Sequence, residues 1–228
     1  MAIITRITYK DLPETGLTGV TGLTDGTFVG DGKIDILIEV EGTSKDIDTV
    51  GLGVDLDDLT FAQGKESVLV THPDLPDVVL SMRSIERVIG TDGALAFDVK
   101  GNAGEVYALL ATAFGKADVT KEVMGIALKL KDSGKTDTEV AQTILDSVAY
   151  KQDALGSSNE TLVKQIYKNV LGTVPSFADL VYFTTELDKG TFTQAQLLEV
   201  ASNLELTRDA DHINLVGMSS ISYTPYEG

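Results

Sequence analysis

The chain has 228 residues, with 35 acidic side chains against 18 basic ones, a net charge of −17 and no cysteine. Its length allows one large domain or two of ordinary size, and a hydrophobic share of 43% is enough to form a folded core. The charge argues against a nucleic-acid or anionic-membrane partner, and the missing cysteines exclude disulfides, thiol nucleophiles, zinc ribbons and iron–sulfur sites.

The first hundred residues consist of short apolar alternations punctuated by glycine and aspartate. Apolar residues recur there at every second position, a period that predicts half-buried strands. We expect strands at residues 3–9, 33–41, 67–71, 78–82, 85–89 and 94–99. Pro73 and Pro76 exclude a continuous helix between the third and the fourth of them. The sequence therefore predicts a β-rich, sandwich-like module over residues 1–100.

After residue 100 the apolar period changes to 3.6, which predicts amphipathic helices. We expect helices at residues 104–114, 121–131, 137–150, 159–171, 176–188 and 193–207, followed by a strand or extended tail at 213–226. Capping signatures, SSNE at 157–160 and TQAQ at 193–196, mark two of the helix starts. The predicted fold class is α+β, with an α-helical module over residues 101–228 after the β-rich module.

The helical half carries an internal repeat. Gly115 and Gly172 lie 57 residues apart, and Gly134 pairs with Gly190 after a slip of one residue. The offset of 57 also pairs apolar residues: Leu109 with Ile166, Phe114 with Leu171, and Leu130 with Leu187. The alternative is that there is no repeat, because two amphipathic helical runs can be aligned this well by chance. We predict two copies of one helical repeat.

Two groups of carboxylates are candidates for a calcium site. In the first group an EF-hand is excluded, because three of the expected oxygen ligands are missing, but a less regular site is not. In the second, a strand would place Asp55 and Asp57 on one face about 7 Å apart, where like charges favour a bound cation. The alternative for the first group is a pair of ordinary Asp-Gly turns, and the alternative for the second group is a solvated loop. The candidate ligands are Asp25, Asp31, Asp35, Asp55, Asp57 and Asp58.

No catalytic constellation stands out, and we expect a protein that is not an enzyme. The two histidines, His72 and His212, are expected on the surface. The glycine-rich stretch GVTGLTDG is not followed by a strand-to-helix switch carrying a lysine, so a P-loop is not expected. Among the tyrosines, Tyr107, Tyr167 and Tyr182 fall on helical stripes and are expected in the core, while Tyr223 and Tyr226 could pack on a neighbouring subunit.

Residues 161–205 carry a specific pattern, read as TLVKQIYKNVLGTVPSFADLVYFTTELDKGTFTQAQLLEVASNLE. It resembles a bacterial domain-of-unknown-function repeat of the form F-V-x-x-L-Y-x-N-V-L-G-R-x-P-D-x-x-G-x-x-Y-W-x-x-x-L-x-x-G. The upstream stretch ALAFDVKGNAGEVYALLATAF looks like the segment that precedes this repeat, so the resemblance covers about residues 83–228. The matching positions are Val163, Tyr167, Asn169, Val170, Leu171, Gly172, Pro175, Tyr182, Leu187 and Gly190.

The resemblance implies export by type I secretion, because the repeat occurs at the C-terminal end of S-layer-like and RTX-type surface proteins. It attaches no enzymatic activity. Residues 54–70 are also similar to the module that flanks calcium-binding RTX blades, although no GGxGxD array is present. The chain departs from the pattern at Thr173, Ser176, Asp179 and Phe183, which replace Arg, Asp, Gly and Trp. The Arg-to-Asp contact that would hold the family's turn is therefore absent.

We accordingly expect an extracellular or cell-surface location, although no classical leader is visible and a cytoplasmic protein is the simpler reading. The leading hypothesis is a non-catalytic structural protein that self-assembles into an S-layer-like sheet or a filament of an extracellular matrix, with calcium as candidate cofactor. The alternative is a secreted adhesin or carbohydrate-binding module with a cell-surface glycan as partner. No stretch of 18 apolar residues exists, so no membrane span is expected.

Overall fold

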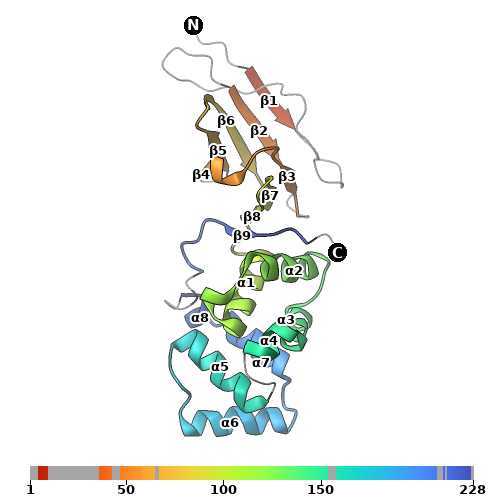
Figure 1. The fold of residues 1–228 in the computed structure, drawn as a ribbon, viewed down its shortest axis with the longest axis vertical. Helices are drawn as coiled ribbons and strands as arrows, with labels where there is room; N and C mark the ends of the chain where they lie inside the picture. Colours follow the sequence, from red (N-terminus) through yellow and green to blue (C-terminus); the bar gives the residue numbers. More distant parts are fainter. Residues whose placement is uncertain are drawn as a thin grey trace. The chain divides into compact units, whose positions relative to one another are not determined.

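The structure is a computed structural model that describes residues 5–9, 36–42, 47–64, 67–153, 158–209, 213 and 215–226. The chain divides into two compact units, Met1–Phe97 and Asp98–Gly228 (Figure 1). Strands β1 to β8 belong to the first unit and helices α1 to α8 to the second. The fold is therefore α+β, a β-rich part followed by a helical part, which confirms the predicted fold class.

The first unit contains two sheets. One has the strand order β1-β2-β6-β5-β4, in which β1, β2 and β6 are parallel while β5 and β4 are antiparallel. The other has the order β3-β7-β8 within this unit. The bounds are β1 Thr5–Tyr9, β2 Ile36–Glu41, β3 Thr49–Gly51, β4 Thr60–Gln63, β5 Val68–His72, β6 Leu75–Arg83, β7 Arg87–Ile89 and β8 Ala94–Ala96.

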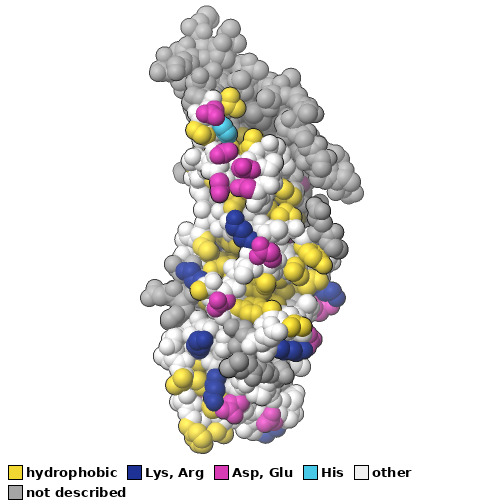
Figure 2. All heavy atoms as spheres, viewed as in Figure 1, with side chains coloured by type: hydrophobic (Ala, Val, Ile, Leu, Met, Phe, Trp, Pro, Cys, Tyr) yellow, Lys and Arg dark blue, Asp and Glu magenta, His cyan; other side chains and the backbone are white. Residues whose placement is uncertain are grey.

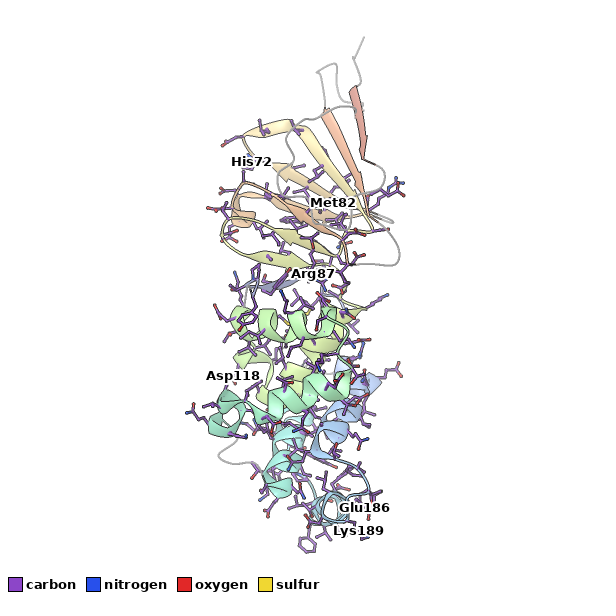
Figure 3. The ribbon with its side chains drawn as sticks, turned by 90° about the vertical axis from the view of Figure 1, so that its right-hand side faces the viewer. His72, Met82, Arg87, Asp118, Glu186 and Lys189 are labelled. Atoms are coloured by element: carbon purple, nitrogen blue, oxygen red, sulfur yellow. The ribbon has the colours of Figure 1, made fainter. Side chains whose placement is uncertain are left out.

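One apolar core lies between these two sheets. Val68 and Val70 of β5, which alternate with less buried neighbours, meet Val50 of β3 and Val88 of β7. Met82 of β6 belongs to the same cluster and is 1% exposed (Figure 3). Residues of both sheets share the same core, so the unit is sandwich-like. Strands β3 and β4 are the two that the sequence pattern did not predict.

The second unit consists of eight helices in its described part and the short strand β9, Ile221–Tyr223. Two predicted helices are each divided in two, at Ser147 and at Leu204, because the backbone of both residues is extended. The helix bounds are α1 Asn102–Phe114, α2 Lys121–Asp132, α3 Asp137–Asp146, α4 Val148–Asp153, α5 Asn159–Leu171, α6 Phe177–Asp188, α7 Gln194–Asn203 and α8 Glu205–Asp209.

The helical unit is built from two copies of one repeat, as the sequence predicts, but each copy has four helices where the sequence pattern predicts three. Helices α5, α7 and α8 begin 57 residues after α1, α3 and α4, and α6 begins 56 residues after α2. The connection before α6 is therefore one residue shorter than the one before α2, and the connection after α6 is one residue longer than the one after α2. This register confirms the slip at Gly134 and Gly190, but it pairs Leu187 with Lys131, so the predicted pairing with Leu130 is wrong by one residue.

The same side-chain hydrogen bond links the first two helices of each copy. In the first copy, Asn102 Nδ2 at the start of α1 donates to Asp132 Oδ1 at the end of α2, over 2.8 Å. In the second copy, Asn159 Nδ2 of α5 donates to Asp188 Oδ1 of α6, over 2.6 Å. The third helix of both copies begins with a capping box, at Thr136 and at Thr193. These shared contacts show that the equivalence extends to side chains.

The two copies join through a buried contact between equivalent positions. Asn169 of α5, which is 7% exposed, donates its Nδ2 protons to the carbonyls of Thr112 and Ala113, both over 3.0 Å. Asn169 lies 57 residues after Thr112, so the contact links one position of the repeat to its own counterpart. The last carbonyls of a helix have no partner within it, and α1 ends inside the protein. Asn169 supplies the donors that these carbonyls need.

We predict that Asn169→Ala lowers the free energy of unfolding by about 3 kcal/mol, because two buried carbonyls lose their donor. Urea denaturation followed by circular dichroism measures this loss. The matched control is Asn203→Ala, because the exposed Asn203 side chain also donates to a helix carbonyl, that of Glu199, over 3.1 Å. Equal and small effects of the two substitutions would contradict the role given to Asn169.

The segment after β9 lies against α2. The backbone N–H of Thr224 donates to the carbonyl of Lys121, over 2.9 Å. A Cβ atom added to Gly125 would lie 1.8 Å from the Thr224 carbonyl oxygen, so only glycine allows this approach. The equivalent residue of α6 is Val181, which is 46% exposed. The tail therefore covers the first copy at a place where the second copy is open.

We predict that Gly125→Ala releases the tail from α2 and costs about 2 kcal/mol of unfolding free energy through overpacking. Limited proteolysis should then cut the segment 221–226 faster than in the unchanged chain. Val181→Ala, the same position in the second copy, should change neither quantity appreciably. Unaltered protection of the tail in Gly125→Ala would show that the close approach is not needed.

Candidate functional site

The carboxylates predicted to bind calcium are only partly described. Asp25, Asp31 and Asp35 lie outside the described residues, so a site formed by them stays a prediction. Asp57 and Asp58 belong to a 3₁₀ turn, Leu56–Asp58, and Asp55 is the residue that precedes it, so none of the three lies in a strand. The strand geometry considered for Asp55 and Asp57 is therefore wrong. All three side chains are exposed, and Figure 2 shows acidic side chains gathered over this turn.

A fourth carboxylate explains why this segment turns. Asp92 accepts the backbone N–H of Leu56 at 2.7 Å and that of Asp57 at 3.3 Å, which stabilises the first residues of the 3₁₀ turn. Thr91 donates its hydroxyl to the Asp55 carboxylate. Within the described part of the chain, no three Asp, Glu or His side chains are grouped in a way that could hold a metal ion. Calcium binding at Asp55, Asp57 and Asp58 stays a prediction.

Some of the histidine and tyrosine side chains have structural roles, and others are exposed on the surface. His72 ends β5, and its Nδ1 accepts the backbone N–H of Asp74 over 3.1 Å in the turn to β6 (Figure 3). His212 lies outside the described residues. Tyr107 is 7% exposed and belongs to the core, as expected. Tyr182 is 60% exposed, so its predicted core position is wrong.

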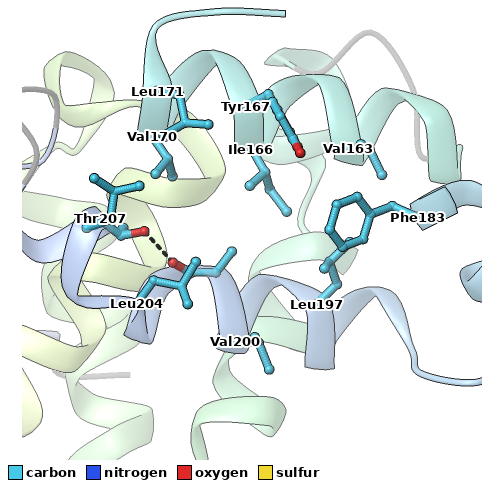
Figure 4. Close-up of a pocket in the computed structure, with 12 residues that line it drawn as sticks. Val163, Ile166, Tyr167, Val170, Leu171, Phe183, Leu197, Val200, Leu204 and Thr207 are labelled. Atoms are coloured by element: carbon cyan, nitrogen blue, oxygen red, sulfur yellow. Dashed lines mark hydrogen bonds between the residues drawn. The ribbon is translucent and has the colours of Figure 1, made fainter. Parts of the chain in front are cut away.

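An apolar groove, here called groove 2, lies between the helices of the second copy (Figure 4). Its volume is about 170 Å³. Helix α5 forms one wall, Phe183 of α6 closes one end, and α7 with α8 forms the other wall. The lining residues are Val163, Ile166, Tyr167, Val170, Leu171, Phe183, Leu197, Val200, Ala201, Leu204, Leu206 and Thr207.

The two polar side chains of groove 2, Thr207 and Tyr167, interact with other groups of the protein. The Thr207 hydroxyl donates to the Ala201 carbonyl over 2.6 Å (Figure 4). Burial raises the pKa of the Tyr167 hydroxyl, and the nearby Asp179 carboxylate raises it further. No acid, amine or imidazole lines the groove. It can therefore hold apolar groups, but its lining carries no pair of groups for acid–base or nucleophilic chemistry.

The first copy carries an equivalent groove, here called groove 1, between α1, α2 and α3 and also of about 170 Å³. Most of its lining occupies the repeat positions that line groove 2, although the side chains differ. The equivalent pairs are Leu110 and Tyr167, Phe114 and Leu171, Ala127 and Phe183, Thr143 and Val200, Ile144 and Ala201, Ser147 and Leu204, and Ala149 and Leu206. A groove at this place is thus a property of the repeat.

The rim of groove 2 is more apolar than that of groove 1. Val200, Leu204 and Leu206 are 60%, 49% and 60% exposed. Their counterparts in groove 1 are a threonine, a serine and an alanine. Exposed apolar side chains around a concave apolar surface are typical of a binding site for another apolar group. Groove 2 is therefore the better candidate site.

The sequence contains part of the signal for these grooves. Val163, Ile166 and Val170 are apolar residues of the helix predicted at 159–171, and all three are buried. The missing signal is the break at Leu204, which turns α8 away from α7 and exposes the apolar residues at their junction. In a single amphipathic helix over 193–207 this junction would not exist, and the apolar residues would not be exposed at it.

No protein-family model matches the chain, and no curated protein matches it. The resemblance at residues 161–205 to the bacterial repeat therefore stays a prediction. Among the described residues, no helix is long and apolar enough to cross a membrane.

We predict that the anionic aromatic dye ANS binds the folded protein at the two grooves, because solvent-exposed apolar surface binds its aromatic rings and enhances its fluorescence. Val200→Glu should lower the signal, and the additional change Thr143→Glu at the equivalent position of groove 1 should lower it further. Val54→Glu places the same charge at an exposed residue of the first unit and serves as control. Equal fluorescence in all variants would show that the dye binds elsewhere.

Proposed function

We propose that the chain is a non-catalytic structural protein of the cell surface or extracellular matrix that self-assembles into a sheet or a filament. The observation that carries this proposal is the pair of equivalent apolar grooves in the two helical repeats. Each offers a concave surface suited to an apolar side chain, and neither contains groups suited to catalysis.

The exposed apolar surface of the helical unit supports this proposal. Val174 and Phe177, at the start of α6, are each 83% exposed, and Figure 2 shows apolar side chains on the surface over α6. Soluble monomers seldom expose contiguous apolar surface without a partner for it. A protein that packs against its own copies needs such contact points, and an internal repeat provides them twice.

The charge of the chain opposes self-assembly and gives calcium a role. A net charge of −17 makes copies repel one another, and no basic region balances it. A divalent cation would lower this repulsion, and the exposed carboxylates of Asp55, Asp57 and Asp58 are available for it. We infer that assembly depends on calcium, either through bound ions or through screening.

We propose export because residues 161–205 resemble repeats of type I secreted surface proteins.

The alternative of a carbohydrate-binding adhesin gains no support from the grooves. Sugar recognition needs several convergent hydrogen-bonding groups, whereas the only polar side chains in groove 2 are Tyr167 and Thr207.

We predict that the full chain forms assemblies that grow with protein concentration and with millimolar calcium, seen by light scattering and negative-stain microscopy. Magnesium and sodium chloride at matched ionic strength separate the two roles of calcium. A larger effect of calcium indicates bound ions, and equal effects indicate screening. A monodisperse monomer at high protein concentration under every one of these conditions would overturn the proposal.

A further inference from the structure

A larger cavity of the helical unit differs from the two grooves in carrying charged side chains. This cavity, here called the α8 cavity, has a volume of about 610 Å³, which lies in the range of roughly 300 to 1,000 Å³ that small-molecule sites have. Helix α8, the residues just before α1 and the segment 215–218 enclose it. Its polar lining consists of Lys100, Asn203, Glu205 and Arg208, and its apolar lining includes Leu215 and Met218.

Backbone hydrogen bonds fix the apolar wall of the α8 cavity to the helix that carries its charges. The N–H of Leu215 donates to the Arg208 carbonyl over 3.0 Å, and the N–H of Met218 donates to the Leu215 carbonyl over 3.3 Å. Gly217, in the turn between them, has a φ of 93°, which favours glycine. The wall and the charged side chains of α8 therefore belong to one ordered structure.

The repeat shows that the second copy has lost a neutralising acid at this cavity. In the first copy, Lys151 Nζ donates to the Asp146 carbonyl over 2.9 Å and lies 3.9 Å from the Asp146 carboxylate. The equivalent residues, 57 positions later, are Arg208 and Asn203, and Arg208 donates to Asn203 Oδ1 over 2.7 Å. The cation and its contact are kept, but a neutral amide replaces the acid. The charge of Arg208 is therefore not neutralised by this contact.

The three charges of the α8 cavity form no ion pair within the described part of the chain. Arg208 and Glu205 lie three residues apart on α8 without pairing, and Lys100 has no carboxylate partner there. Asp98, two residues before Lys100, instead accepts the N–H of Ala103 at the start of α1, over 3.1 Å. The cavity thus offers two cations and one anion beside an apolar wall.

This combination of charges favours a ligand that carries charges of both signs. Lysine and arginine bind a carboxylate through charge-assisted hydrogen bonds, and arginine can do so with two parallel N–H groups. A ligand with a carboxylate alone would be repelled by Glu205, whereas a ligand with an ammonium alone would be repelled by Lys100 and Arg208. The apolar wall suits an apolar body between the two charged ends. A short peptide of apolar residues has all three features.

We propose that the α8 cavity binds a short apolar peptide by its two ionised ends. Lys100 and Arg208 bind the terminal carboxylate, Glu205 binds the terminal ammonium, and the side chains of the peptide pack on Leu215 and Met218. This activity goes beyond the proposed self-assembly. The α8 cavity shares no lining residue with groove 1 or groove 2, so either proposal can fail without the other.

Isothermal titration calorimetry of the full chain with the dipeptide Leu-Leu tests the site. We expect a dissociation constant of about 0.2 mM, which is typical for a ligand of this size. Two matched probes each lack one charge: N-acetyl-Leu-Leu has no ammonium, and Leu-Leu amide has no carboxylate. Each should bind about tenfold more weakly than Leu-Leu, because one charge-assisted contact is lost.

Variants of the cavity assign each charge of the peptide to its partner. Arg208→Gln should weaken Leu-Leu about tenfold and leave Leu-Leu amide unchanged, while Glu205→Gln should weaken Leu-Leu to a similar degree without weakening N-acetyl-Leu-Leu. Lys100→Gln is a second variant of the carboxylate side in case Arg208→Gln unfolds, which circular dichroism would show. Lys168→Gln, at an exposed lysine of α5 outside the cavity, is the matched control and should change nothing.

Three results would overturn the proposal. The first is the absence of saturable binding at millimolar Leu-Leu. The second is binding of N-acetyl-Leu-Leu as tight as that of Leu-Leu, which would mean a site for anions only. The third is an equal loss of affinity for all three probes in a folded Arg208→Gln or Glu205→Gln variant, because a merely structural role of these side chains would have that effect.

Discussion

The arrangement of the helical unit depends on the hydrogen bonds of one buried amide. Helix α1 ends inside the protein, and the carbonyls of Thr112 and Ala113 need donors there. Asn169 provides both, and it can do so only if α5 crosses α1 with equivalent positions face to face. The first helices of the two copies thus pack on each other, as do the third helices α3 and α7, while α2 and α6 pack on the first helix of their own copy. The grooves follow from this arrangement, because each is enclosed by one copy alone.

The two copies have diverged in a way that gives them different surfaces. In the first, Lys131 forms a half-buried ion pair with Glu105 over 2.9 Å and a second one with Asp137. In the second, the counterparts of Lys131 and Glu105 are Leu187 and Leu162, both buried. Gly125 lets the tail of the chain cover α2, whereas Val181 leaves the same face of α6 open. The first copy is thus covered by its own chain at this face, whereas the second copy leaves the equivalent apolar surface exposed.

Much of this fold could be predicted from the sequence, because helix and strand periods and capping residues act locally. The bounds of α5 and the strand period around β5 are examples. The division at Ser147 and Leu204 was not predicted, because the helical pattern runs through both positions. At Ser147 a local signal does exist, since its Oγ accepts the backbone N–H of Tyr150 over 3.1 Å at the start of α4. The candidate site was also missed, because the exposed positions of Val200, Leu204 and Leu206 depend on the division between α7 and α8, whereas one helix over 193–207 was expected. The turn at Asp55–Asp58 depends on the distant Asp92, which pairs with it only in the folded chain.

The central claim is that groove 2 is the surface through which copies of the chain meet. Methyl NMR spectra recorded at rising protein concentration test it directly, because the lining residues other than Tyr167 and Phe183 carry methyl groups that report on their own surroundings. The account predicts that the signals of Leu171, Val200, Leu204 and Leu206 shift together with concentration, while that of the exposed Val148 does not. Constant groove signals in a sample that assembles, with shifts confined to other residues, would contradict it.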